Sequence, residues 1–219
     1  MVSVVGVGPG NPLYLTPLAR QRIEEAEVLV GGRRLLALFP MAKGERIPLQ
    51  GKSDLERVLQ GFQKVVVLAS GDPLLFGVMD WVLSLVPPRE VEIIPGISSF
   101  QYMLARLQIP LKDVAVVSLH GRREEIISLV QHHQTVVVFT DAHHTPVVIA
   151  RMLLEAGING CVMYVGEHLS YEDESVQRFS VEELARSEDK FGLNLVVIQR
   201  CTHSFSVSPT AYFDVTMFP

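Results

Sequence analysis

The chain has 219 residues, of which 48% are hydrophobic, with 24 acidic and 19 basic side chains and a formal net charge of -5. This composition allows one compact domain or two small ones with a sizeable core, and the acidic balance gives no support to a general nucleic-acid-binding surface. No apolar run reaches membrane-spanning length and no signal peptide precedes the first predicted strand, so we expect a soluble cytoplasmic protein. Cys161 and Cys201 lie in apolar strand-like runs, which predicts buried thiols, and no Cys/His cluster has metal-ligand spacing.

The chain opens with a predicted buried strand that runs into the glycine-rich turn Gly6-Val7-Gly8-Pro9-Gly10. Its spacing is close to the dinucleotide fingerprint G-x-G-x-x-G, but the third glycine comes one place early and Pro9 lacks an N–H for a phosphate cradle. The next helix begins only at Thr16-Pro17, a good N-cap followed by a good first helical residue. The glycines therefore do not lead straight into a helix, and a nicotinamide site of the Rossmann type is not expected.

Residues 17–60 are predicted to contain helices and one strand. A helix over 17–27 precedes the strand 28–30, which Gly31-Gly32 ends. A short helix over 33–39 begins with Arg33 and Arg34, which form either a solvated helix start or a clamp for anionic groups at a strand end. Residues 40–51 are expected to form a loop, and a helix over 53–60 follows.

The stretch from Ala69 to Gly77 lies between the apolar runs 64–68 and 78–86, which are typical of a buried parallel strand and a helix. It is therefore a strand-to-helix turn at the carboxyl end of a strand, where open α/β sheets bind ligands. Gly71 permits a backbone conformation closed to other residues, and Pro73 fixes the entry into the helix. Asp72 either caps the helix or contacts a ligand.

A second turn of this kind, Pro95-Gly96-Ile97-Ser98-Ser99, follows the predicted strand 91–94. Ser98 or Ser99 is expected to cap a helix that runs through Leu107. If the two strands are parallel neighbours, the turns lie beside each other. The serines then either cap the helix alone or share a small ligand with Gly71-Asp72.

After a linker at 109–112, the chain begins a second α/β series. Strands are predicted over 113–119, 135–139, 161–165 and 194–198, with an extended segment at 175–179. Helices are predicted over 124–131, from Thr145-Pro146 to Glu155, and after the capping box Ser180-Val181-Glu182-Glu183. We therefore expect an N-terminal domain over 1–111, a C-terminal domain over 112–202 and an unassigned tail over 203–219. Polar residues at strand ends in both halves indicate a cleft between them.

Taken together, these motifs resemble the tetrapyrrole methylase family. The resemblance covers the chain to about residue 200 and rests on four motifs in this order: Val5 to Gly10 with Leu15-Thr16, Ser70 to Pro73 with Gly77, Pro95 to Ser99, and Thr140-Asp141. These enzymes use S-adenosylmethionine and have a two-domain fold distinct from the Rossmann-like methyltransferases. The resemblance thus implies an α/β, two-domain fold with the active-site cleft between the domains.

Within the family, residues 30–35, the stretch from Ser118 to Arg122, and Gly166-Glu167 are most similar to members that methylate C-5 of precorrin-7, with or without cobalt, in cobalamin biosynthesis. In other members a second methyltransferase domain acts at C-15, so we expect that activity in a separate partner protein. The family is usually homodimeric. The alternatives are methylation of another precorrin position or of ribosomal RNA, and the acidic net charge counts against RNA.

The resemblance also implies site residues. S-adenosylmethionine is expected to contact Gly71, Asp72, Pro73, Phe76, Ser98, Ser99, Thr140, Gly166, Asn194 and Leu195, and the Pro9 turn is expected to border the macrocycle. Precorrins carry several carboxylates, which guanidinium groups bind bidentately, so we predict anchors at Arg33, Arg34, Arg122 and Arg123. Asp72, His120 and Asp141 are candidates for moving a proton, and each is equally well explained by a structural role.

Overall fold

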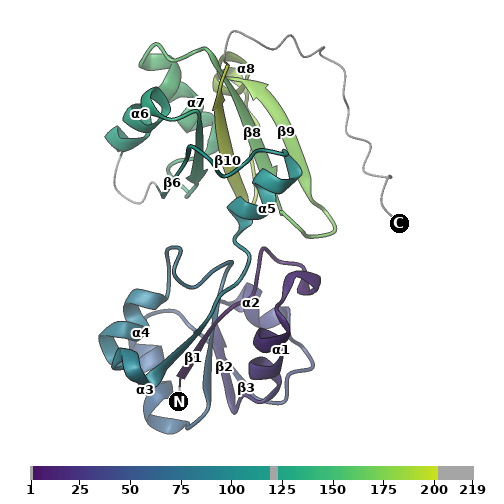
Figure 1. The fold of residues 1–219 in the computed structure, drawn as a ribbon, viewed down its shortest axis with the longest axis vertical. Coiled ribbons are helices and arrows are strands. Elements are labelled where there is room, and N and C mark those ends of the chain that lie inside the picture. The colour runs from purple at the N-terminus through teal and green to yellow at the C-terminus, as the bar shows by residue number, and fades with distance from the viewer. Residues whose placement is uncertain (1, 119–122, 202–219) are drawn as a thin grey trace.

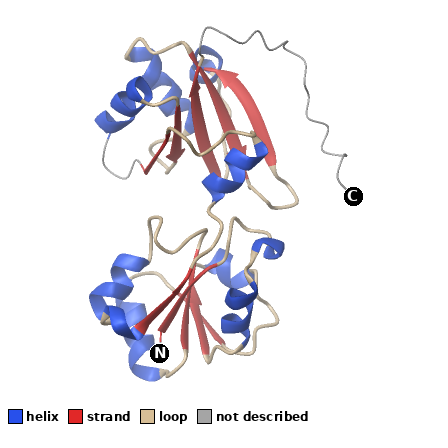
Figure 2. Cartoon of the chain, in the orientation of Figure 1, coloured by secondary structure: helices blue, strands red, loops and turns tan. Residues whose placement is uncertain are grey.

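The structure, a computed structural model, describes residues 2–118 and 123–201. They form two α/β domains stacked end to end, each with helices packed on its own sheet (Figures 1 and 2). The two-domain α/β fold is therefore confirmed. None of the helices within the described residues has the length and apolar character needed to cross a bilayer.

The sheet of the first domain has the order β3-β2-β4-β1-β5, and each neighbouring pair is parallel. Its strands are β1 (Val2–Gly6), β2 (Val28–Gly31), β3 (Glu45–Pro48), β4 (Val65–Ala69) and β5 (Val91–Ile94). Helices α1 (Pro17–Glu24) and α2 (Arg33–Ala37) cover one face, whereas α3 (Lys52–Gly61) and α4 (Met79–Leu85) cover the other. Because both faces are covered, β1, β2 and β4 are valine-rich and buried along their whole length.

The prediction of a loop over residues 40–51 is wrong, because Glu45–Pro48 forms the edge strand β3. It pairs in parallel with β2, from Val28 opposite Glu45 to Gly31 opposite Pro48. A polar, half-exposed edge strand has no apolar run to reveal it, and Pro48 is tolerated at a sheet edge, where its missing N–H needs no partner.

The sheet of the second domain has the order β6-β7-β10-β8-β9. Strands β6 (Val114–Ser118) and β7 (Thr135–Phe139) are parallel, and β10 (Asn194–Arg200), β8 (Cys161–Glu167) and β9 (Ser175–Ser180) continue the sheet antiparallel. Helices α6 (Arg123–His132), α7 (Pro146–Glu155) and α8 (Val181–Arg186) cover one face. Strand β8 is two residues longer than predicted.

The other face of this sheet is covered by α5 (Ser99–Arg106), which follows β5 of the first domain in the chain. Figure 1 shows α5 beside this sheet, and Met103 and Leu104 of α5 pack against Val137, Leu195 and Val197 of its strands. The chain therefore crosses between the domains just after β5. The domain boundary at residues 111 and 112 stays a prediction.

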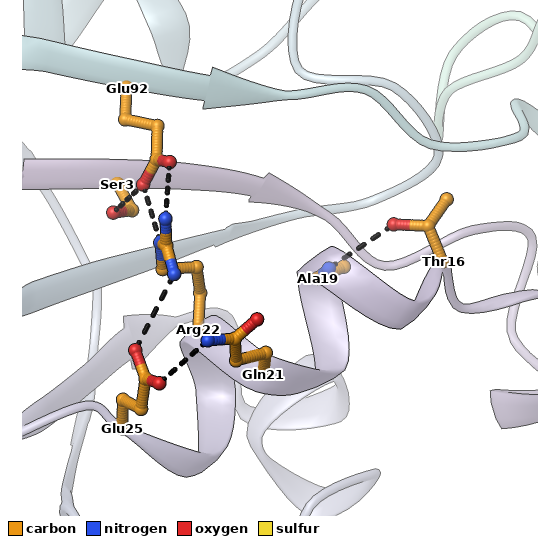
Figure 3. Close-up of polar contacts among 7 residues, drawn as sticks. All are labelled: Ser3, Thr16, Ala19, Gln21, Arg22, Glu25 and Glu92. Carbon is orange, nitrogen blue, oxygen red and sulfur yellow. Dashed lines mark hydrogen bonds and ion pairs between the residues drawn. The ribbon is translucent and has the colours of Figure 1, made fainter.

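Helix α1 is fastened to the first sheet near the amino ends of β1 and β5. Nε and Nη2 of Arg22 each lie 2.8 Å from a carboxylate oxygen of Glu92 on β5, and the Ser3 hydroxyl on β1 donates to the same carboxylate at 2.7 Å (Figure 3). Thr16 caps α1 as predicted, since its hydroxyl accepts from Ala19 N (Figure 3). These bonds leave the carboxyl ends of the strands available for other contacts.

The two cysteines differ in exposure. Cys161 is buried in β8 as expected, and burial raises the pKa of its thiol. The prediction for Cys201 is wrong, because β10 ends at Arg200 and the exposed thiol follows it.

Candidate active site

Turns with glycines follow β1, β4 and β5, and they pack backbone against backbone. A Cβ on Gly96 would lie 2.3 Å from the carbonyl oxygen of Gly71, and a Cβ on Gly6 would lie 2.6 Å from the same atom. Gly8 and Gly71 exchange backbone hydrogen bonds, with N–O distances of 2.9 and 3.3 Å. The two predicted glycine turns thus lie side by side, although β1 runs between their strands.

Asp72 and Ser98 fix the shape of these turns. The Asp72 carboxylate accepts hydrogen bonds from Leu74 N at 2.9 Å and from Gly96 N at 3.2 Å, so it joins the turn after β4 to the turn after β5. Ser98 is buried and caps α5 in a capping box with Gln101. The hydroxyl of Ser99 has no hydrogen-bond partner among the described residues and remains available.

At the facing edge of the second sheet, β7 and β8 end where β10 begins. The register places Leu195 beside Phe139 on one side and Gly166 on the other. Thr140 Oγ1 lies 2.9 Å from Asn194 Oδ1 and 3.0 Å from its carbonyl oxygen, so this hydroxyl donates to Asn194. Thr140, Gly166, Asn194 and Leu195 are thereby brought together at one edge.

The two edges meet at what we call the domain seam. It is the set of contacts that Asn11, Tyr14, Arg34 and Phe76, which lie next to the first sheet, make with residues of the second sheet, of its connections and of α5, which packs on that sheet. Phe76 meets Phe139 edge to face, with ring centroids 5.6 Å apart, and Tyr14 meets Tyr102 of α5 in the same way at 5.2 Å. Phe76 is half exposed and has a φ of 59°, in the left-handed region that a bulky residue adopts only at a cost. Asn11 N donates to Ser170 Oγ at 2.9 Å.

Comparison with known proteins identifies the family. A profile of the Tetrapyrrole (Corrin/Porphyrin) Methylases matches residues 1–185. The chain belongs to the tetrapyrrole methylase family. Over 203 residues it is 37% identical to the cobalt-precorrin-7 C(5)-methyltransferase of Salmonella typhimurium, with 90% of this chain and 98% of that protein aligned.

Two solved structures of the family have the same fold. The precorrin-6Y methylase of Archaeoglobus fulgidus is 25% identical with a TM-score of 0.73, over 91% of this chain and 97% of that chain. The uroporphyrin-III C-methyltransferase of Thermus thermophilus, in complex with S-adenosylhomocysteine, is 27% identical with a TM-score of 0.73, over 90% of this chain and 96% of that chain. The predicted family and the predicted methyltransferase class are both confirmed.

In this tetrapyrrole methylase two of the candidates for moving a proton, Asp141 and Asp72, hold backbone segments in place. The carboxylate of Asp141 accepts from His143 N and His144 N at 2.7 Å and contacts His144 Nδ1 at 3.0 Å. These bonds hold the pKa of Asp141 well below its usual range, which makes it a weak proton acceptor. Asp72 is likewise occupied by two backbone donors. His120 lies outside the described residues.

The predicted arginine anchors divide into three groups. Arg34 Nη1 donates to the hydroxyl of Tyr171 and Nη2 lies 3.2 Å from Ser70 Oγ, so Arg34 spans the domain seam. Arg33 is exposed and makes no hydrogen bond or ion pair within residues 2–118 and 123–201. Arg122 lies outside the described residues, and Arg123 opens α6.

Three residues near the candidate site were not predicted from the sequence to belong to it. Phe139 and Tyr171 are seam aromatics that no motif contains, although Gly10 carries an indirect signal, since a Cβ there would lie 2.2 Å from the ring of Tyr171. Glu174 accepts from Ser170 N at 2.6 Å and pairs with Arg106 Nε at 3.0 Å. The pKa of Tyr102 is raised, chiefly by burial of its hydroxyl and in addition by a hydrogen bond to Glu174. Pro9, expected to border the macrocycle, is buried, and the next residue, Gly10, lies against the ring of Tyr171.

Proposed function

We propose that the chain is an S-adenosylmethionine-dependent methyltransferase that methylates C-5 of precorrin-7, with or without cobalt, in cobalamin biosynthesis. The observation that carries this proposal is the 37% identity to the Salmonella C(5)-methyltransferase, which extends over 98% of that protein. Agreement over 90% of this chain and 98% of that protein extends through both domains, so it supports the same acceptor as well as the same cofactor.

The residues at the turns fit the cofactor. Residues 70–77 and 95–99 contain a single charged side chain, the acidic Asp72, and no basic side chain. These turn segments themselves therefore favour a cationic sulfonium ligand over a pyrophosphate, because they contribute no lysine, arginine or row of free glycine N–H groups. Arg34, which bonds to Ser70, comes from α2 and is assigned to the acceptor below. The exposed ring of Phe76 and the free hydroxyl of Ser99 add apolar and polar contacts of the kind that an adenosyl group needs.

In this proposal the cofactor lies between the two edges. The turns at Gly71-Asp72-Pro73, Phe76 and Ser98-Ser99 would hold it from the first domain, and Thr140, Gly166, Asn194 and Leu195 from the second. When bound, S-adenosylmethionine supplies an electrophilic methyl group on a sulfonium that leaves readily. The main task of the protein is then to hold donor and acceptor in line, which can lower the barrier by several kcal/mol without a covalent enzyme nucleophile.

The acceptor would bind on the arginine side of the seam. Arg33 has no acidic partner among the described residues and is exposed, so its guanidinium is free to pair with a propionate or acetate side chain of the macrocycle. Arg34, Arg122 and Arg123 complete the proposed set, and His120 remains the candidate for accepting a proton.

The proposal is tested by locating the transferred methyl group. The purified chain is incubated with methyl-¹³C S-adenosylmethionine and either cobalt-precorrin-7 or metal-free precorrin-7, and the label is located by NMR. We expect label at C-5 of at least one macrocycle. Label at another carbon assigns a different precorrin position, and label only in added ribosomal RNA overturns the tetrapyrrole acceptor. In calorimetry S-adenosylhomocysteine should bind and NADH, the control, should not.

We also propose a cytoplasmic homodimer that works with a separate C-15 methyltransferase and decarboxylase. Leu13 and Met41 are 87% and 89% exposed, and a dimer interface would cover apolar side chains of this kind. Sedimentation velocity measures the dimer, and a sedimenting species of about 24 kDa would refute it.

A further inference from the structure

Tyr171 is a side chain of the second domain that lies among the turns of the first. It belongs to the connection between β8 and β9, residues 168–174, which faces the first domain in Figure 1. Its ring lies so close to Gly10 that an added Cβ would come within 2.2 Å of Cε2 and 2.5 Å of Cζ. Its hydroxyl accepts a hydrogen bond from Arg34 Nη1.

This connection is braced from both domains. Ser170 Oγ accepts from Asn11 N at 2.9 Å, which joins the connection to the turn after β1. Glu174 accepts from Ser170 N at 2.6 Å and pairs with Arg106 of α5 at 3.0 Å. Contacts with both domains therefore set the position of Tyr171, and they hold its hydroxyl in place as a hydrogen-bond acceptor.

Arg34 is held at the seam by neutral groups. Its two partners, the hydroxyls of Tyr171 and Ser70, accept one N–H each from Nη1 and Nη2, and no carboxylate pairs with it among the described residues. The five N–H donors of a guanidinium form a rigid fork, so two bonds of this kind orient the group and leave the other N–H donors available. Besides these hydroxyls, the guanidinium has the Tyr171 ring nearby, with Cζ 6.0 Å from the ring centroid. No carboxylate of residues 2–118 or 123–201 compensates its positive charge, which favours an anionic ligand at the seam.

We infer that Tyr171 is a positioning residue, which orients the guanidinium of Arg34 for a carboxylate of the acceptor. This inference rests on the proposed function, because it takes the acceptor to be a carboxylate-bearing macrocycle. Tyr171 acts through Arg34, so its hydroxyl matters only while the guanidinium is present. The first domain supplies the guanidinium, and the second domain supplies the tyrosine hydroxyl that orients it.

A double-mutant cycle tests this dependence. Tyr171→Phe keeps the ring on Gly10 and removes only the hydroxyl, Arg34→Ala removes the guanidinium, and the third variant combines both. Tyr164→Phe is the matched control, because the Tyr164 hydroxyl on β8 bonds to no described residue. For each protein we would measure kcat and KM for precorrin-7, the dissociation constant of S-adenosylhomocysteine by calorimetry, and the unfolding midpoint.

For Tyr171→Phe we expect KM for the macrocycle to rise by about tenfold, as for the loss of one hydrogen bond to a charged group, with kcat nearly unchanged. The affinity for S-adenosylhomocysteine and the unfolding midpoint should match those of Tyr164→Phe. In the Arg34→Ala background, Tyr171→Phe should have no further effect on KM.

Other outcomes overturn the inference. An unchanged KM in Tyr171→Phe means that the hydroxyl does not position the anchor. An equal rise in KM with and without Arg34, or a lowered unfolding midpoint and weaker S-adenosylhomocysteine binding, means that Tyr171 has a structural role. If the wild-type protein turns over no precorrin while it binds S-adenosylhomocysteine, the proposed acceptor fails instead, and macrocycle-independent readouts still report whether the fold is intact.

Discussion

Replacing Gly96 by alanine should separate the turns that form the proposed cofactor site. The new Cβ would lie 2.3 Å from Gly71 O and 2.8 Å from Gly6 C, both backbone atoms that no rotamer change can move. The Gly71 carbonyl must withdraw by about 0.7 Å before the contact reaches 3.0 Å, the shortest that real Cβ atoms show. That withdrawal stretches the Gly8 N–Gly71 O hydrogen bond, which is already 3.3 Å long.

Two costs contribute to this change. Overpacking of a rigid region costs about 1–3 kcal/mol. Displacing Gly96 N from the carboxylate of Asp72, now 3.2 Å away, weakens a charge-assisted hydrogen bond that is worth about 1.5–3 kcal/mol. We therefore expect a loss of about 3 kcal/mol in the free energy of unfolding, or about 6–12 °C in midpoint for a chain of this length.

The assay is thermal unfolding followed by circular dichroism, with calorimetric titration of S-adenosylhomocysteine. The matched control is Gly61→Ala at the end of α3, where an added Cβ meets nothing within 4 Å and should stabilise the helix by about 0.5–1 kcal/mol. We expect Gly96→Ala to bind S-adenosylhomocysteine at least about tenfold more weakly, since 1.4 kcal/mol suffices for that factor. A Gly96→Ala protein that unfolds and binds like the wild type would refute the reasoning.

Three further experiments test other parts of the structure. Glu92→Gln should cost about 1–3 kcal/mol at pH 7, because the Arg22–Glu92 pair is about a quarter exposed and so weaker than a fully buried one. Arg22 lowers the pKa of Glu92, so this stabilisation is present above the unfolded pKa of about 4.3 and is lost as pH falls; urea titrations should show the gap closing below pH 4, and a constant gap would contradict the linkage. In the folded protein an aromatic disulfide reagent should modify exposed Cys201 readily and buried Cys161 only on unfolding, and two fast thiols in the absorbance trace would be inconsistent with the structure. Phe76→Gly should be about 1 kcal/mol more stable in urea than Phe76→Ala, because glycine adopts a φ of 59° without strain; equal midpoints would show that the turn relaxes instead.

Local chemistry was sufficient to predict much of this protein from its sequence. Thr16, Ser98, Thr145 and Ser180 cap the helices that they were expected to begin, because a cap depends on residues within one helical turn. The apolar runs likewise predicted the buried strands, because a strand buried on both faces is apolar along its own length. The glycine turns were expected to lie side by side, and they do; that they bind a ligand stays a prediction.

Contacts between distant segments decided the rest. The edge strand β3 depends on a partner, β2, and carries no apolar run of its own. Helix α5 follows the first sheet in sequence but packs on the second, because its buried Met103 and Leu104 face apolar residues there. The orientation of Arg34 is set by Tyr171, which is 137 residues away in the chain. A local pattern states which groups need a partner, and only the tertiary structure determines which partner each one receives.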